Sequence, residues 1–159
     1  MSRPPTSLET LVRHRAAHAD CGSRRVWRFH SHAYFDHDVP ECVTEARAFR
    51  ELIRRTFAAT RDVEVSSFIP APAGPHPCGS FEVLFTRAAF ADYVLWLMFA
   101  RPERIDVLIH PLTRSQTLDH TARALWFGTP RAIDRRMLEA VDATLLASGA
   151  SEECIIDGT

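Results

Sequence analysis

Two kinds of hydrophobic periodicity follow one another along this chain, and their order restricts the fold more than any other feature. Four short segments have the composition and alternation of strands, at Trp27–Asp36, Asp62–Ile69, Ser80–Thr86 and Ile105–His110. Two longer segments repeat apolar residues every three or four positions, which predicts helices over Glu41–Ala59 and Ala88–Ala100. The order is therefore strand, helix, strand, strand, helix, strand.

This order predicts an α+β fold of the ferredoxin-like, split βαβ type, an antiparallel sheet with helices on one face. We expect the first and third strands to be central and parallel, with the fourth antiparallel beside the first. The start of the first strand, the loop before the third and the end of the fourth should then meet at one edge. That loop is PAPAGPHPCG, because proline and glycine interrupt both helices and strand ladders.

The 159 residues suffice for one domain with its own core. We predict an N-terminal extension over residues 1–25 with at most one short helix, a domain over 26–130, and a C-terminal helix and tail over 131–159. Within these, Asp119–Gly128 fits a short helix or a strand, whereas Asp134–Ala147 has a helical pattern. The last dozen residues are expected to fray.

Histidines occur where this fold would bring distant segments together. His30 and His32 are two residues apart on the first strand, so both side chains leave the same face, and Tyr34 follows at the next step. His76 lies in the loop segment AGPHP, and His110 ends the fourth strand. We expect these side chains to converge on the sheet face that points away from the helices.

A cluster of this kind indicates a metal or acid–base site. Neutral imidazole binds zinc and non-haem iron, and a carboxylate completes many such sites. The alternation of the third strand places Glu82 on the same face. If a carboxylate completes the ligand set, Glu82 would replace one of the histidines. Two interpretations fit Asp119 and His120. Asp119 is a helix cap and His120 a surface residue, or the Asp119 carboxylate orients the His120 imidazole. The histidines in polar loop or tail sequence are expected to have no such role; these are His14, His18 and His37.

Composition narrows the classes of function. The formal net charge of -1 argues against nucleic acid as the main partner. All 19 basic residues are arginine, which excludes a lysine Schiff base and a phosphate-binding loop lysine. The four cysteines are scattered without a CxxC pair, and no apolar run is long enough to span a bilayer. Since the polar start also lacks a secretory signal, we expect a cytoplasmic protein with reduced thiols and no membrane association.

Six motifs resemble, in their order and spacing, the DOPA 4,5-dioxygenase family of fungi and bacteria. They are FHSHAYFD, GPHP, WLMFAR, IDVLIHPLT, DHT and ALWFG, and they span roughly residues 28–130. The resemblance implies a ferredoxin-like α+β fold, a homodimer, and extradiol cleavage of a catechol substrate with a non-haem metal and dioxygen. Ser31 departs from the pattern, where a small apolar residue is expected, but it should face the helices.

Carried over residue by residue, the resemblance implies a candidate site of five histidines, His30, His32, His76, His110 and His120, and it does not say which of them bind the metal. We assign the individual roles from the mechanism expected for such a site. The expected metal ligands are His30, His32 and His110, and the expected catalytic residues are His76, His120 and Tyr34. The expected metal is Fe(II), with zinc as the alternative in purified protein, and an imidazole that titrates near neutrality suits proton transfer in either direction. Two other interpretations stay open: a metal-free ferredoxin-like dimer that acts as a binding protein, and a cofactor-independent oxygenase or isomerase with one histidine as base.

Overall fold

The computed structural model describes residues 26, 28–113 and 115–147. In chain order the elements are β1 (Arg28–Phe35), α2 (Pro40–Thr56), β2 (Val63–Ile69), β3 (Gly79–Thr86), α3 (Phe90–Ala100), β4 (Asp106–Pro111), α4 (Gln116–Asp119), β5 (Leu125–Phe127) and α5 (Arg135–Ala147). The four predicted strands and three predicted helices are confirmed to within a few residues. The predictions for residues 1–25 and for the last dozen residues, with His14 and His18, lie outside the described residues.

The five strands form one sheet in the order β2-β3-β1-β4-β5, and every neighbouring pair is antiparallel. The ferredoxin-like α+β fold is therefore confirmed, with β5 added at one edge. The prediction that β1 and β3 are parallel was wrong. The crossover through α2 makes β2 run in the same direction as β1, and the chain then reverses into β3, which must oppose β1.

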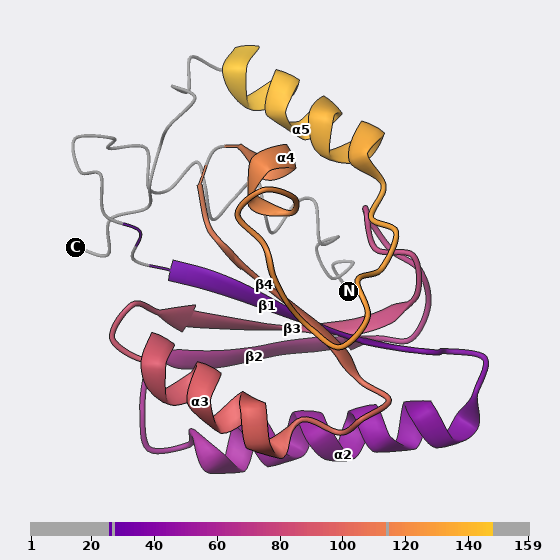
Figure 1. Cartoon of the computed structure of the whole chain (residues 1–159), viewed down its shortest axis with the longest axis vertical. Coiled ribbons are helices and arrows are strands. Elements are labelled where there is room, and N and C mark those ends of the chain that lie inside the picture. The colour runs from indigo at the N-terminus through magenta and orange to yellow at the C-terminus, as the bar shows by residue number, and fades with distance from the viewer. Residues whose placement is uncertain (1–25, 27, 114, 148–159) are drawn as a thin grey trace, which may run out of the picture.

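Two helices cover one face of the sheet, where they pack side by side (Figure 1). The core between them and the sheet includes Phe35 from β1, Phe49 from α2 and Leu97 from α3, all at most 2% exposed. Pro40 occupies the first turn of α2, where its missing N–H costs no hydrogen bond. None of the helices in the described part of the chain combines the length and apolar character that a bilayer-spanning helix requires.

Strand β2 carries a bulge that the sequence pattern did not indicate. Val65 pairs with Val83 and Phe68 with Phe81, so β2 has one extra residue between the two pairs. The predicted alternation of Val63, Val65, Ser67 and Ile69 was therefore wrong beyond Val65. The bulge instead turns Phe68 toward the core, where its ring stacks on Phe35 at 4.7 Å between centroids.

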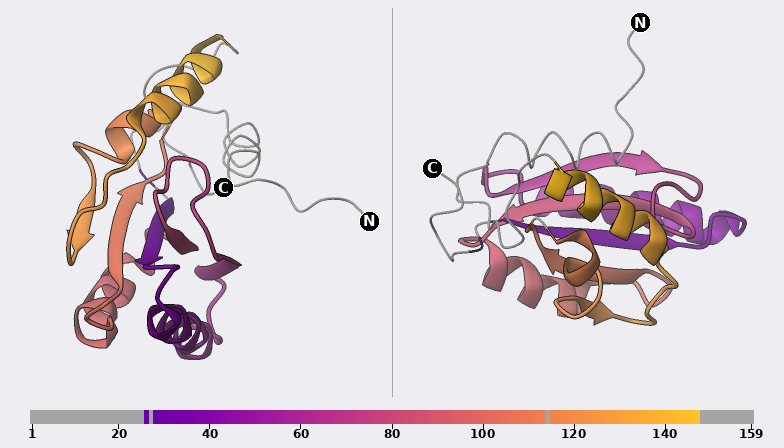
Figure 2. Two further views of the ribbon diagram at one scale, coloured as in Figure 1. Left: turned by 90° about the vertical axis from the view of Figure 1, so that its right-hand side faces the viewer. Right: turned by 90° about the horizontal axis from the view of Figure 1, so that it is seen from above.

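The C-terminal part of the chain adds a layer on the other side of the sheet. Figure 2 shows α4 and α5 on the side opposite α2 and α3, joined by the strand β5 and its loops. Tyr34 and Leu108, which project to this side, pack against Trp126 and Ile133 from this layer. The segment Asp119–Gly128, left open between helix and strand, contains the end of α4 and the whole of β5. The face that carries the predicted site is thus enclosed.

Candidate active site

Five histidines meet between the sheet and this C-terminal layer. Two come from β1, one from β4, one from the loop before β3 and one from the residue after α4: His30, His32, His110, His76 and His120. All five are between 0 and 5% exposed. The ring of His32 lies at the centre, because the other four ring centroids are between 4.3 and 5.5 Å from its own.

Strand register places the three sheet histidines. His30 lies directly opposite His110 in the β1–β4 pair, and residues opposite one another across antiparallel strands project to the same face. In the β1–β3 pair, His32 lies opposite Glu82. The alternation read from the sequence therefore located these four side chains on one face, as the structure has them.

His76 reaches the cluster from the opposite end of β1. The expectation that it arrives at the same sheet edge as His30 and His110 was wrong, because Gly79 at the start of β3 pairs with Phe35 at the end of β1. Two backbone hydrogen bonds hold His76 in its loop: its N–H donates to the Ala73 carbonyl at 3.1 Å, and its carbonyl accepts from the Ala73 N–H at 3.2 Å. Its ring nevertheless lies closest to His32 among the four neighbours, at 4.3 Å between centroids.

Backbone carbonyls fix the tautomers of two of these rings. The Nδ1 atom of His110 lies 2.7 Å from the carbonyl oxygen of Pro111, and the Nδ1 atom of His120 lies 3.0 Å from that of Gln116. A carbonyl only accepts, so Nδ1 carries the proton in both rings and Nε2 of the neutral ring carries a lone pair. The Nε2 atom of His110 is 3.0 Å from Nε2 of His32.

Glu82 and His32 are close but do not form an ion pair near neutral pH. The Glu82 Oε1 atom is 3.6 Å from Nδ1 of His32, and neither atom has a hydrogen bond among the described residues. Burial, reinforced by His76 and the other histidines, holds the pKa of His32 well below its usual value. Burial also raises the pKa of Glu82 to about 7. His32 is therefore a neutral ring with a lone pair.

Tyr34 and His76 form the other close polar pair of the site. The Tyr34 hydroxyl lies 2.8 Å from Nδ1 of His76. Burial raises the pKa of Tyr34 well above its usual value, so the phenol keeps its proton. Burial, and then the electrostatic effect of the neighbouring His120, lower the pKa of His76 to about 3. His76 thus departs from the expected titration near neutrality and is an unprotonated imidazole at pH 7.

The cluster contains two overlapping groups that could hold a metal ion. In each, one donor atom from every member lies within 4.8 Å of the others: one is His30, His32 and His110, and the other is His32, His76 and His120. Metal–nitrogen bonds of about 2.1 Å at right angles separate two ligand nitrogens by about 3.0 Å. The 3.0 Å between Nε2 of His32 and of His110 fits that geometry. Buried, neutral imidazoles with inward lone pairs therefore suit a divalent cation.

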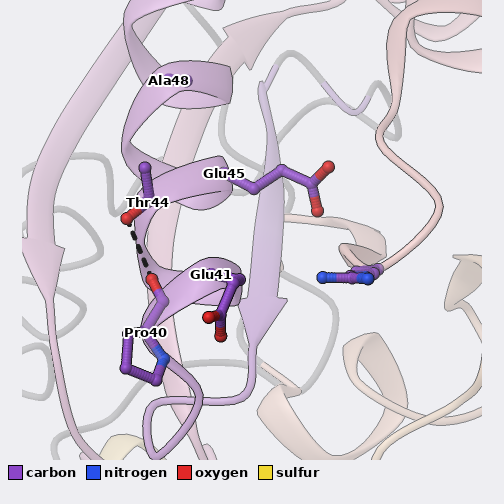
Figure 3. Close-up of a pocket in the computed structure, with 6 residues that line it drawn as sticks. Pro40, Glu41, Thr44, Glu45 and Ala48 are labelled. Atoms are coloured by element: carbon purple, nitrogen blue, oxygen red, sulfur yellow. Dashed lines mark hydrogen bonds between the residues drawn. The ribbon is translucent and has the colours of Figure 1, made fainter.

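Two other features of the surface do not compete with this cluster. Asp36, His37 and Asp38 also come close enough to hold an ion, but they occupy an exposed turn. A hollow of about 430 Å³ lies along α2 and is lined by Pro40, Glu41, Thr44, Glu45, Ala48 and Arg104. Figure 3 shows the five residues that α2 contributes to it. It lacks any histidine, so it offers acidic groups and one guanidinium rather than a metal site of the kind described above.

Asp119 is buried rather than at the surface. Its carboxylate accepts hydrogen bonds from the backbone N–H and hydroxyl of Thr113, each at 2.8 Å, and from Arg123 at 3.2 Å. It thereby ties α4 to the end of β4, while the ring of His120 donates to the Gln116 carbonyl. No sequence pattern indicated Gln116 or its partner Asp142 on α5, because the contact between them joins residues 26 positions apart.

Comparison with known proteins associates this geometry with one family. The sequence profile of the Dopa 4,5-dioxygenase family matches residues 29–137, which include all five histidines. A DOPA 4,5-dioxygenase of Amanita muscaria is 30% identical over 129 residues, which cover 80% of this chain and 52% of that protein. An uncharacterized 21.2 kDa protein of Botryotinia fuckeliana is 34% identical, with 70% of this chain and 63% of that protein covered. The chain thus spans between half and two thirds of these relatives.

A solved structure shows the same relationship. The crystal structure of a provisionally assigned dioxygenase from Nostoc punctiforme superposes with a TM-score of 0.61 and is 31% identical. The match covers 73% of this chain and 94% of that one. The fold described above is therefore the fold of that bacterial protein.

Proposed function

This chain belongs to the Dopa 4,5-dioxygenase family, and on that premise we propose that it is an extradiol dioxygenase of catechols. In the proposed reaction the ring bond beside a hydroxyl-bearing carbon breaks, and both atoms of dioxygen enter the ring-opened product. The observation that carries the proposal is the buried cluster of five histidines, of which His32 and His76 are neutral at pH 7. We expect the substrate to be DOPA or another small catechol.

For the metal we propose the ligands His30, His32 and His110. The support is the pairing of His30 with His110 across the strands and the 3.0 Å separation of Nε2 of His32 from Nε2 of His110. We propose Fe(II) as the native metal, with zinc as the substitute in purified protein, since imidazole binds both. A bound non-haem iron would supply the redox chemistry by which a catechol reacts with dioxygen.

His76 and His120 are then left for proton transfer. The Nε2 atom of His76 makes no hydrogen bond within the described residues, and its Nδ1 atom is held by Tyr34. We propose that Nε2 accepts a proton from a catechol hydroxyl and later returns it to the product. Because the pKa of His76 is depressed to about 3, the ring is unprotonated at neutral pH and its Nε2 atom is free to accept a proton.

Aromatic side chains beside the cluster suit an aromatic substrate. The ring of Tyr34 stacks on Trp126 with centroids 5.7 Å apart, and Trp126 is only partly buried. We propose that a catechol ring packs against this pair, since aromatic rings favour offset stacking. The expected homodimer stays a prediction, which sedimentation of the purified protein tests.

The decisive experiment is metal analysis of anaerobically purified protein, followed by DOPA or catechol under oxygen. We expect about one iron per chain, oxygen uptake equal to the substrate consumed, and a yellow ring-opened product. Metal without turnover of any catechol would contradict the proposed substrate class. Full turnover in excess chelator would instead favour the cofactor-independent oxygenase, with His76 as base, and absence of both metal and turnover would favour the binding protein.

A further inference from the structure

We propose that Asp142, on the outer helix α5, is a positioning residue that fixes the ring of His120. The proposal rests on the proposed function only in placing His120 in the active site. Asp142 acts through one peptide group, the one between Gln116 and Thr117. That group connects the Asp142 carboxylate to the His120 imidazole.

The first contact is at the start of α4. The backbone N–H groups of Gln116 and Thr117 both donate to the carboxylate of Asp142, the second at 3.0 Å. Such N–H groups at a helix start lack partners within the helix and are normally capped by the residue just before it. In the described part of the chain the Ser115 side chain forms no such cap. Asp142 therefore caps α4 from a different helix.

The second contact is on the other side of the same peptide group. The Gln116 carbonyl accepts a hydrogen bond from Nδ1 of His120 at 3.0 Å, and another from the backbone N–H of His120 at 3.0 Å. The N–H of Thr117 and the carbonyl of Gln116 belong to one amide. A hydrogen bond from that N–H to a carboxylate makes the carbonyl a stronger acceptor. Asp142 thus favours the His120 tautomer whose Nδ1 is protonated.

This tautomer directs the His120 lone pair into the cluster. With Nδ1 protonated, Nε2 is the acceptor, and the His120 ring lies 4.0 Å from the ring of His110 between centroids. Carboxylates that hold a histidine directly are a known way of orienting metal-site imidazoles. Here the carboxylate acts through an intervening peptide. The residue before α5 also contacts the loop that carries His76, because the Asp134 N–H donates to the carbonyl of Pro75 at 2.9 Å.

Packing of α5 is the competing explanation for the position of α4. Leu138, Val141 and Leu145 are all buried, and they would hold α5 in place without any carboxylate. The variant Leu138→Ala tests this explanation, because it weakens the packing and leaves Asp142 intact. Glu139→Gln is the matched control for charge: Glu139 is on the same helix, is exposed, and pairs only with Arg135 among the described contacts.

The experiment reads the His120 tautomer by nitrogen-15 NMR of metal-free, histidine-labelled protein. We expect a pure Nδ1–H form in the native protein, in Glu139→Gln and in Leu138→Ala, and a mixture in Asp142→Ala. Asp142→Asn should be intermediate, since its amide oxygen still accepts one N–H.

Two results would overturn the proposal. One is an unchanged His120 tautomer in Asp142→Ala. The other is that Leu138→Ala and Asp142→Ala lower the thermal unfolding midpoint equally and also show the same tautomer mixture. That result would mean that packing of α5, and not the Asp142 carboxylate, sets the His120 tautomer. The tautomer is measured without metal or substrate. A native protein that fails to turn over catechols would therefore contradict the proposed function and leave this test valid.

Discussion

The Nε2 atoms of His32 and His110 face each other across 3.0 Å, from neighbouring strands and without measurable exposure of either residue. The proton on Nδ1 of His110 is committed to the Pro111 carbonyl, so its Nε2 is an acceptor. The short Nε2–Nε2 distance is favourable only if His32 donates a proton from its Nε2 atom or if a cation lies between the two rings. The pair therefore has two stable conditions, one with a shared proton and one with a bound cation.

Removing either imidazole should abolish metal binding. For His32→Ala and His110→Ala we expect iron affinity to fall by more than about 100-fold, because losing even an outer orienting group costs 10- to 100-fold. Catechol turnover should disappear with it, while far-ultraviolet circular dichroism stays native. His37→Ala, in the turn after β1, is the control and should retain both. Full activity in either cluster variant would contradict the ligand assignment.

Tyr34→Phe should slow catalysis and leave the metal in place. The substitution removes the hydroxyl 2.8 Å from Nδ1 of His76 and keeps the ring that stacks on Trp126. We expect kcat to fall about 100-fold, the lower range for loss of assisted proton transfer. Tyr93→Phe is the control, because that buried hydroxyl bonds to Ser31 on the opposite sheet face. Equal kcat in the two variants would remove Tyr34 from the mechanism.

The bond between Tyr93 and Ser31 should contribute to stability alone. The Tyr93 hydroxyl donates to Ser31 Oγ at 3.0 Å inside the helix-covered core, and both residues are at most 1% exposed. Ser31→Ala should lower the free energy of unfolding by about 1–3 kcal/mol, because it leaves a buried hydroxyl unpaired. Adding Tyr93→Phe should recover much of this loss. Urea unfolding of the two single variants and the double variant checks the cycle, and simple additivity would contradict it.

Acid should destabilise the metal-free protein in two stages. His32 and His76 have folded pKa values below 6.5, so the unfolded chain binds protons that the folded chain excludes, and stability falls as pH drops below about 6.5. Glu82 acts in the opposite direction between pH 4.5 and about 7, since its folded pKa is raised and the folded chain holds the extra proton. Stability should therefore decline gently down to about pH 4.5 and steeply below it.

Glu82→Gln separates these two contributions. Without the opposing carboxyl, the steep loss of stability should begin near pH 6.5 instead of near pH 4.5. Urea unfolding of metal-free protein at half-unit pH steps would show the shift. Superimposable profiles for the native protein and this variant would mean that Glu82 titrates normally in the folded state.

The sequence pattern was sufficient for the sheet part of the site and insufficient for the rest. Alternation in β1 and β4 places His30, His32 and His110 on one face because a strand has a fixed two-residue period. His76 depends on the direction of β3, which follows from chain reversal after the α2 crossover and has no local signal. His120 depends on a four-residue helix capped by a residue from α5, and the local pattern, which allowed a short helix only from Asp119 onward, does not place that helix at Gln116–Asp119.

The two faces of β1 make this strand intolerant of changes in length. Its even-numbered residues carry the imidazoles and the phenol, and its odd-numbered residues enter the core beside Phe49 and Leu97. A deletion of one residue would exchange the two faces over the rest of the strand, moving histidine into hydrocarbon and phenylalanine into the site. At the sheet edge, β2 already accommodates an inserted residue as a bulge. Insertions and deletions should therefore be tolerated in β2, whereas β1 should tolerate substitutions alone.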